Sequence, residues 1–251
     1  MRRLLLVLPL LLAIGLVACG GGGKGSGTAT PPTSSDQSSQ TPAAAPTQSG
    51  TPVPDPFASL QSYRYDMNLS ADGATSIEIK GTVENPGNIR MDFYLSDSTT
   101  PISSLIIVGQ QAWTQNEGDE SWTTLSVDEA EGEVAGLMPR DFWGSFPIDQ
   151  LVAMSKDQGE EEVNGVQAHH YQISQVDADM MSKLAEIFGS TGEEDQPTSF
   201  NMDLWRVDNG GWPAKASINV GYPPGGQVTN GQITWEVSDV NAVTESLQPP
   251  Q

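Results

Sequence analysis

The sequence predicts a fold of the α+β class, with about ten strands in an antiparallel sheet and roughly four helices gathered on one face of it. Three observations support this prediction. Apolar and polar residues alternate in many short segments, which is typical of half-buried strands. The gaps between these segments are short, whereas parallel neighbours would need long crossovers. The segments 128–156 and 177–188 break the alternation, and helices there could cover the apolar face of the sheet.

The expected strands follow one another through most of the chain. The first alternates Tyr63, Tyr65, Met67 and Leu69 with polar residues. The next are expected at 77–83, 89–95, 105–108, around 113, at 122–125, 166–174, 200–207, 213–220 and 227–239. Turn residues such as Asn85-Pro86-Gly87-Asn88 separate neighbouring strands, so the order favours an antiparallel meander.

Helices are expected in two places. The segment 128–156 is apolar without alternating, and Pro139 and Pro147 divide it. Since proline favours the first turn of a helix, we expect two or three short helices there. Asp177 is placed to cap a further helix that runs to Phe188.

The first residues have the layout of a secretory signal. Arg2 and Arg3 precede an apolar run at 4–17, whose 14 residues fall short of the ~20 that a membrane-spanning helix needs. The ending Leu16-Val17-Ala18-Cys19 resembles the lipobox of bacterial lipoproteins. That resemblance implies that residues 1–18 are a signal peptide, that Cys19 carries acyl chains, and that the protein is anchored outside the cytoplasm to the bacterial cell membrane. A plain secretory signal with a coincidental cysteine is the alternative.

Composition divides the rest of the chain into a tether and one domain. Residues 19–55 are rich in Gly, Ser, Thr, Pro and Gln and hold almost no large apolar residue, which predicts a disordered tether. Residues 56–251 are long enough for one domain with a sizeable core. Cys19 is the only cysteine, so no intramolecular disulfide can support this domain.

The strong negative charge limits the possible partners. The formal charge of −21 becomes −23 once residues 1–18, with two arginines and no acid, are removed. A chain of this charge repels polyphosphate, so we expect no nucleic acid partner. It also repels anionic headgroups, so a lipid anchor rather than surface charge would hold it at a membrane.

Several short segments carry a family resemblance: 203–215, with a tryptophan, a glycine hairpin and a proline; 81–83 and 89–93, in the first meander; and 231–237 with 239–241, in and after the last strand. These segments resemble the LolA/LolB-like and LppX/LprG-like superfamily of bacterial lipoproteins. The resemblance implies a curved antiparallel half-barrel whose concave face is covered by helices. It also implies an apolar interior that binds a lipid or acyl chain and carries it between membrane sites, without a cofactor.

Twelve apolar residues of the expected strands would line such a cavity. They are Tyr65, Met67, Leu69, Ile77, Ile79, Met91, Phe93, Leu95, Met202, Leu204, Ile218 and Val220. Methionine suits a variable ligand because its side chain is flexible and polarizable. The alternative is a solid core, in which case the protein would bind a protein or peptide partner through an exposed aromatic or edge-strand patch.

The segment 128–156 is a candidate lid. If Phe142, Trp143 and Phe146 are exposed there, they could contact a membrane or a partner. Burial of the three side chains under the sheet is the alternative.

Catalytic and metal-binding patterns are weak. His169 and His170 are adjacent on an expected strand, so their side chains point to opposite faces, and no thiol is near to complete a metal site. The Gly-x-Ser-x-Gly motif of hydrolases is not in the sequence. We therefore expect no metal, no cofactor and no enzymatic activity, and we interpret the acidic runs at 160–162 and 193–195 as solvated loops.

Overall fold

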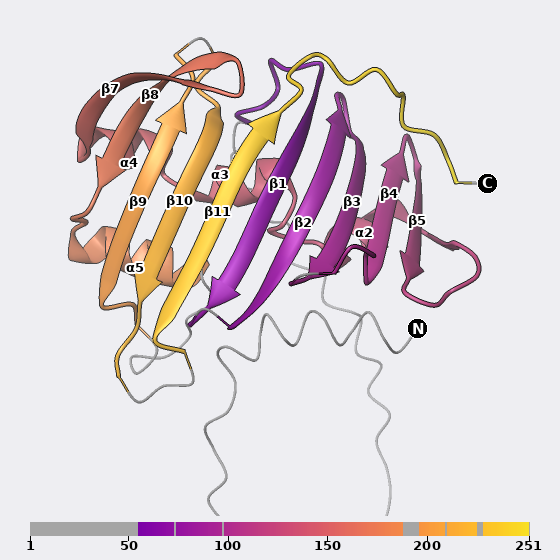
Figure 1. Cartoon of the computed structure of the whole chain (residues 1–251), viewed down its shortest axis with the longest axis horizontal. Helices are drawn as coiled ribbons and strands as arrows, with labels where there is room; N and C mark the ends of the chain where they lie inside the picture. The colour runs from indigo at the N-terminus through magenta and orange to yellow at the C-terminus, as the bar shows by residue number, and fades with distance from the viewer. Residues whose placement is uncertain are drawn as a thin grey trace, which may run out of the picture.

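The computed structural model describes residues 55–250 except for 73, 97, 188–195, 209 and 225–227. The expected signal peptide, Cys19 and all but the last residue of the expected tether therefore lie outside the described residues, as does the acidic run at 193–195. In the described part, eleven strands form one antiparallel sheet in the order β6-β5-β4-β3-β2-β1-β11-β10-β9-β8-β7 (Figure 1). The first and last strands pair in the middle of this sheet.

The sheet consists of two meanders that meet at β1 and β11. The first contains β1 (Ser62–Ala71), β2 (Ala74–Glu84), β3 (Asn88–Leu95), β4 (Ser103–Val108), β5 (Gln111–Asn116) and β6 (Thr123–Leu125). The second contains β7 (Lys156–Val163), β8 (Val166–Ile173), β9 (Ser199–Arg206), β10 (Pro213–Gly221) and β11 (Asn230–Ser238). The prediction of an antiparallel sheet is confirmed, with one strand more than the ten expected.

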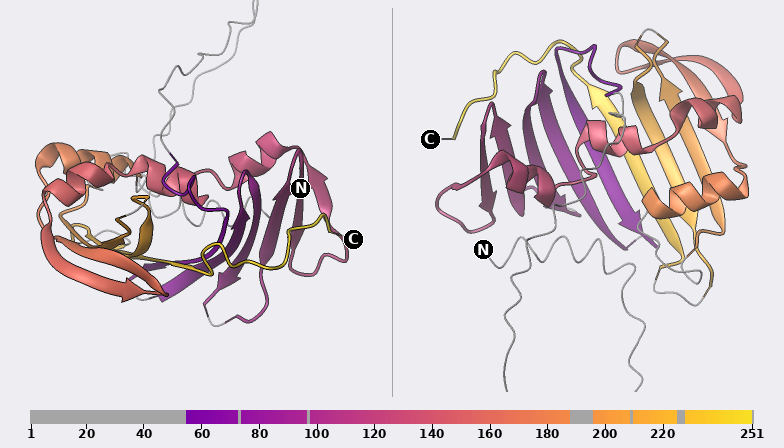
Figure 2. Two further views of the ribbon diagram at one scale, coloured as in Figure 1. Left: turned by 90° about the horizontal axis from the view of Figure 1, so that it is seen from above. Right: turned by 180° about the vertical axis from the view of Figure 1, so that it is seen from behind.

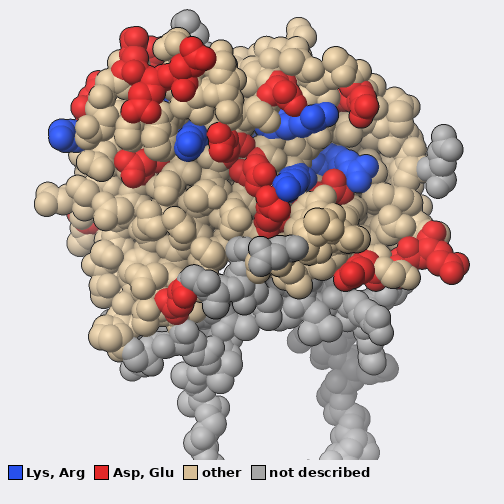
Figure 3. Space-filling model, in the orientation of Figure 1, with Lys and Arg blue, Asp and Glu red and all other residues tan. Residues whose placement is uncertain are grey.

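The additional strand is β7, which the sequence does not reveal. It lies at one edge of the sheet, and Val163 is the only one of its eight residues that is buried. Glu160, Glu161 and Glu162 form part of this strand, so the prediction of a solvated loop there was wrong. An exposed edge strand has no buried face, and its residues therefore show no alternation. Acidic side chains gather over this end of the sheet (Figure 3).

Four described helices lie on the concave face of the curved sheet (Figure 2). They are α2 (Val127–Glu133), α3 (Pro139–Ser145), α4 (Ile148–Ala153) and α5 (Ala178–Ile187). The expected helix starts are confirmed. Pro139 is the first residue of α3, and Pro147 directly precedes α4. At the start of α5, Asp177 Oδ1 accepts a hydrogen bond from the Met180 amide at 2.8 Å. None of the described helices combines the length and the apolar character that crossing a membrane requires.

The register of the strands places the apolar residues of successive strands in rows on the concave face. Met67 pairs with Ile79 on β2 and with Trp235 on β11. In the next row, Leu69 pairs with Ile77 and Ile233. The curved sheet and the helices over its apolar face confirm the α+β half-barrel that the resemblance implies.

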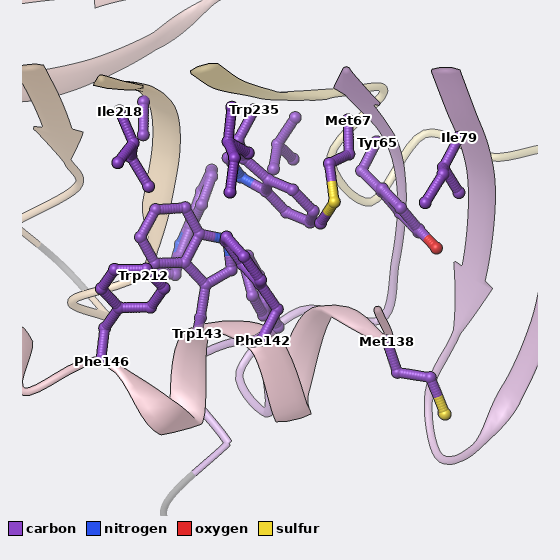
Figure 4. Packing of buried hydrophobic residues seen from close by; sticks show 14 of the residues in the cluster. Tyr65, Met67, Ile79, Met138, Phe142, Trp143, Phe146, Trp212, Ile218 and Trp235 are labelled. Atoms are coloured by element: carbon purple, nitrogen blue, oxygen red, sulfur yellow. The ribbon is translucent and has the colours of Figure 1, made fainter. Parts of the chain in front are cut away.

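Trp235 is the centre of an aromatic cluster between the sheet and the helices (Figure 4). Its ring stacks on Tyr65 at 5.0 Å and meets Trp143 edge-on at 5.7 Å. Phe57, just before β1, lies 5.8 Å from it. The indole Nε1 donates to the Pro213 carbonyl at 3.1 Å, so the ring is held by a hydrogen bond as well as by packing.

Candidate functional site

The structure brings the twelve candidate cavity residues together on the concave face. Ten of them are buried: Tyr65, Met67, Ile77, Ile79, Met91, Phe93, Met202, Leu204, Ile218 and Val220. Leu69 is partly buried against the same apolar core. Leu95 lies at the end of β3 and is 39% exposed, so it is outside the core.

The aromatic side chains of α3 fill the space above these residues. Phe142, Trp143 and Phe146 are all buried and point toward the sheet (Figure 4). Their rings contact one another, with centroids 5.1–5.5 Å apart. Of the two positions considered for these side chains, the structure therefore has the buried one.

Several residues of the apolar core were not among the twelve. They include Phe57, Tyr63, Met138, Trp212 and Trp235. Trp235 stands between Ile233 and Val237 in an expected strand, so its alternation could have identified it. Phe57 and Met138 lie outside regular strands, and periodicity gives no signal for residues of that kind.

Two hydrogen-bond donors are buried in this apolar core without a partner among the residues that the structure describes. They are the Tyr65 hydroxyl and the Trp143 indole Nε1, on residues that are 3% and 1% exposed. Burial raises the pKa of Tyr65, so its hydroxyl stays protonated and remains a donor. Each unpartnered buried donor costs about 1–3 kcal/mol, and an acceptor brought between the sheet and α3 would recover that energy.

Gly81 provides the room for the Tyr65 ring. The two residues are paired between β1 and β2, and a Cβ atom at Gly81 would overlap the ring of Tyr65. Because Gly81 has no side chain, the Tyr65 ring can lie along the sheet and stack on Trp235.

The two histidines of β8 contact separate groups of acidic residues on the neighbouring strands and after β9, in agreement with the opposite orientation expected of adjacent residues. His170 stacks on Trp205 at 4.2 Å and lies between Glu161, at 3.1 Å, and Asp203, at 2.9 Å. Glu161 also accepts a hydrogen bond from the Trp205 indole at 2.8 Å, and these two bonds hold the pKa of this carboxyl below its ordinary value.

His169 lies with two carboxylates whose spacing could accommodate a metal ion. Its Nε2 atom is 3.3 Å from Glu160 and 3.4 Å from Asp208, and the three potential ligand atoms lie within 4.8 Å of one another. The sequence could not reveal this group, because Glu160 is on the unpredicted strand β7 and Asp208 follows β9. At these distances the imidazole can also contact the two carboxylates directly, without a metal ion.

Comparison with known proteins gives likenesses in structure only. No family model and no curated protein matches the chain. Among solved structures, it is similar to the Mycobacterium tuberculosis lipoprotein LppX, at 15% identity over 77% of this chain and 92% of that one, with a TM-score of 0.43. LprF from Mycobacterium bovis matches at 13% identity over 78% and 92% of the two chains, with a TM-score of 0.46. A LolA superfamily protein from Nitrosomonas europaea matches at 11% identity over 77% and 91%, with a TM-score of 0.31. The described sheet and helices have the architecture that the resemblance to this superfamily implies, and the likeness to these structures concerns the fold alone.

Proposed function

We propose that this protein is an extracytoplasmic lipoprotein that binds a lipid or acyl chain between the concave face of its sheet and helix α3, and carries it between membrane sites. The observation that supports it best is the pair of buried donors, the Tyr65 hydroxyl and the Trp143 indole, in an otherwise apolar core. A lipid has the complementary composition, because its ester or amide carbonyls are acceptors attached to apolar chains.

The core residues around these donors can adapt to a ligand. Met67, Met91 and Met202 are fully buried on the sheet, and Met138 is buried where α3 begins. Methionine side chains change shape at little cost, so they can repack around an acyl chain. Apolar sites with a few polar groups are typical of lipid-binding proteins.

Helices α3 and α4 are the elements that would move to admit the chain. They have seven and six residues, and no side chain caps the start of either. The described ion pair between α4 and the sheet joins Asp149, whose side chain is 86% exposed, to Arg206 at 2.9 Å. Exposed pairs of this kind contribute little to stability. Apolar contacts therefore hold these helices, and an acyl chain could replace them.

The lipid anchor at Cys19 and the tether at 19–55 complete this proposal. Two acyl chains hold a protein at a membrane stably, whereas a single chain binds only marginally. A flexible tether would then let the domain reach a donor and an acceptor.

A protein or peptide partner is the alternative function, and the edges of the sheet favour it less. Strand β6 has three residues, and β7 presents acidic side chains along most of its length. Short or charged edge strands resist pairing with another chain.

The test compares lipid retention with stability in variants that remove one donor each. Residues 19–251 with Cys19→Ser would be incubated with phospholipid vesicles, separated from them, and examined by native mass spectrometry. We expect about one lipid per protein. Tyr65→Phe and Trp143→Phe should each weaken retention roughly tenfold. Tyr65→Phe should leave the ligand-free protein as stable or more stable, because it removes only the unpartnered hydroxyl. Trp143→Phe should lower the stability of the ligand-free protein, because the smaller ring leaves a space in the core.

Tyr94→Phe is the matched control, since Tyr94 lies on the opposite face of β3, where Lys80 contacts its ring at 5.2 Å. It should retain lipid like the unaltered protein. A protein that stays free of lipid after exposure to vesicles would overturn the proposed function.

A further inference from the structure

We propose that the convex face of the sheet carries a second binding site, for a neutral saccharide, in a polar hollow at the ends of β1, β9, β10 and β11. The hollow has a volume of about 590 Å³. Its side chains include Ser70, Asp72, Ser199, Asn201, Asn219 and Gln232. This site is separate from the apolar core, because the sheet lies between them.

The strand register aligns four of these residues in one row. Ser70 pairs with Gln232, Gln232 with Asn219, and Asn219 with Asn201. Their neighbours along the strands, such as Ile218 and Ile233, point to the opposite face and belong to the apolar core. With strands about 4.8 Å apart, the row is on the order of 14 Å long, which suits a short oligosaccharide.

These polar groups are available to a ligand. The side chains of Ser70, Ser199, Asn201, Asn219 and Gln232 form no hydrogen bond with another described residue, and the three amide side chains are exposed. Each amide offers both a donor and an acceptor, and each hydroxyl can act as either. Sugar hydroxyls also both donate and accept, so a row of amides matches a row of hydroxyls.

The charge of the hollow excludes other classes of ligand. No Lys or Arg is among the described residues of the lining, so a phosphate or carboxylate would find no counter-charge there. The one carboxylate among the described lining residues, that of Asp72, already accepts hydrogen bonds from Thr229 and from the Asn230 backbone amide at 2.7–3.0 Å. In a protein of charge −21, the ends of β9 and β10 around the hollow carry uncharged residues (Figure 3). A neutral polyhydroxyl ligand fits this environment.

The experiment uses the folded chain, 19–251 with Cys19→Ser, and neutral trisaccharides of glucose and of N-acetylglucosamine. Binding would be followed through the side-chain NH₂ signals of Asn201, Asn219 and Gln232 in ¹⁵N–¹H spectra. Because few hydrogen bonds would form and no aromatic residue is among the described lining residues, we expect a Kd of roughly 1–10 mM. Asn219→Ala and Asn201→Ala should each weaken binding about fivefold or more.

Asn68→Ala is the matched control, because Asn68 lies on the same face of β1 but outside the lining. It should bind like the unaltered protein. Vesicles containing a neutral diglycosyl lipid form a second arm. Binding of free trisaccharides identifies a glycan ligand, whereas binding of the vesicles alone identifies a glycolipid headgroup. Either result supports the proposal if Asn219→Ala weakens that binding about fivefold or more.

Two results would overturn the proposal. The first is the absence of signal changes with every one of these probes at about 20 mM, above the expected Kd. The second is binding that Asn219→Ala and Asn201→Ala leave unchanged. Neither result bears on lipid retention in the apolar core, so the two proposed sites can fail independently.

Discussion

Gly81 determines whether Tyr65 can occupy its place in the core. We predict that Gly81→Ala lowers the free energy of unfolding by about 1–3 kcal/mol, because the new methyl group overlaps a ring that is held against Trp235. Urea denaturation would measure the change. Gly132→Ala is the control: Gly132 lies in α2 with open space around its Cβ position, so alanine there should stabilise by about 0.5–1 kcal/mol. Equal effects at the two positions would contradict this account.

Asp66 and Asp72 should affect stability with opposite signs. Burial and the neighbouring Glu78 raise the pKa of Asp66. A raised pKa means that the charged form is disfavoured in the folded protein, so stability falls as the pH rises through that pKa. Asp66→Asn should therefore raise the Tm at pH 7, and the gain should shrink as the pH falls toward about 4, the ordinary value for Asp.

For Asp72 the direction is reversed. Hydrogen bonds from Thr229, together with those from Asn230, hold the pKa of Asp72 below its ordinary value. The ionised Asp72 carboxylate therefore contributes to stability above the pKa that Asp72 has in the unfolded chain. This contribution is lost as the pH falls through the lower pKa that Asp72 has in the folded protein. Asp72→Asn should lower the Tm at pH 7 and should have no effect in strong acid, as thermal melts across pH would show. Shifts of the same sign in both variants would show that hydrogen bonding and burial are not the causes.

At the scale of elements, the start of α5 depends on one side chain. Asp177 Oδ1 accepts the Met180 amide at 2.8 Å, which satisfies one of the free donors of the first turn. We predict that Asp177→Ala lowers the free energy of unfolding by about 1 kcal/mol, measured by chemical denaturation. Asp177→Asn should keep most of the stability that the cap contributes, because an Asn side chain can still accept this hydrogen bond. An Asn variant as unstable as the Ala variant would indicate that charge rather than capping is important.

Elements with one buried face were predictable from the sequence. In β1 and β3, buried residues alternate with more exposed ones along much of each strand, and the sequence shows the same period. Strand β7 was not predictable, because its pairing with β8 depends on backbone hydrogen bonds and leaves no apolar pattern. The prolines and Asp177 located the helices because capping is local chemistry.

At the scale of the whole molecule, the sequence predicted the side of the apolar core that the sheet contributes. It predicted neither the packing of α3 on that side nor the polar hollow on the convex face. Alternation identified the sheet residues that line the core, such as Met67 and Leu204, because a period of two assigns a face. It could not place Trp143 against Trp235, since that contact depends on how helix α3 returns over the sheet. The polar hollow was equally invisible, because Asn and Ser on an outer face are ordinary until four strands bring them together.

The pairing of β1 with β11 has a consequence for how the molecule folds. Arg64 and Asp239, 175 positions apart in the chain, form an ion pair at 3.1 Å where these strands meet. Contacts between such distant residues form slowly, because a long loop must close first. Strand β11, the last of the described strands along the chain, therefore joins the two meanders. Until it arrives, β1 has an open edge in what will become the centre of the sheet, where a second chain could pair instead.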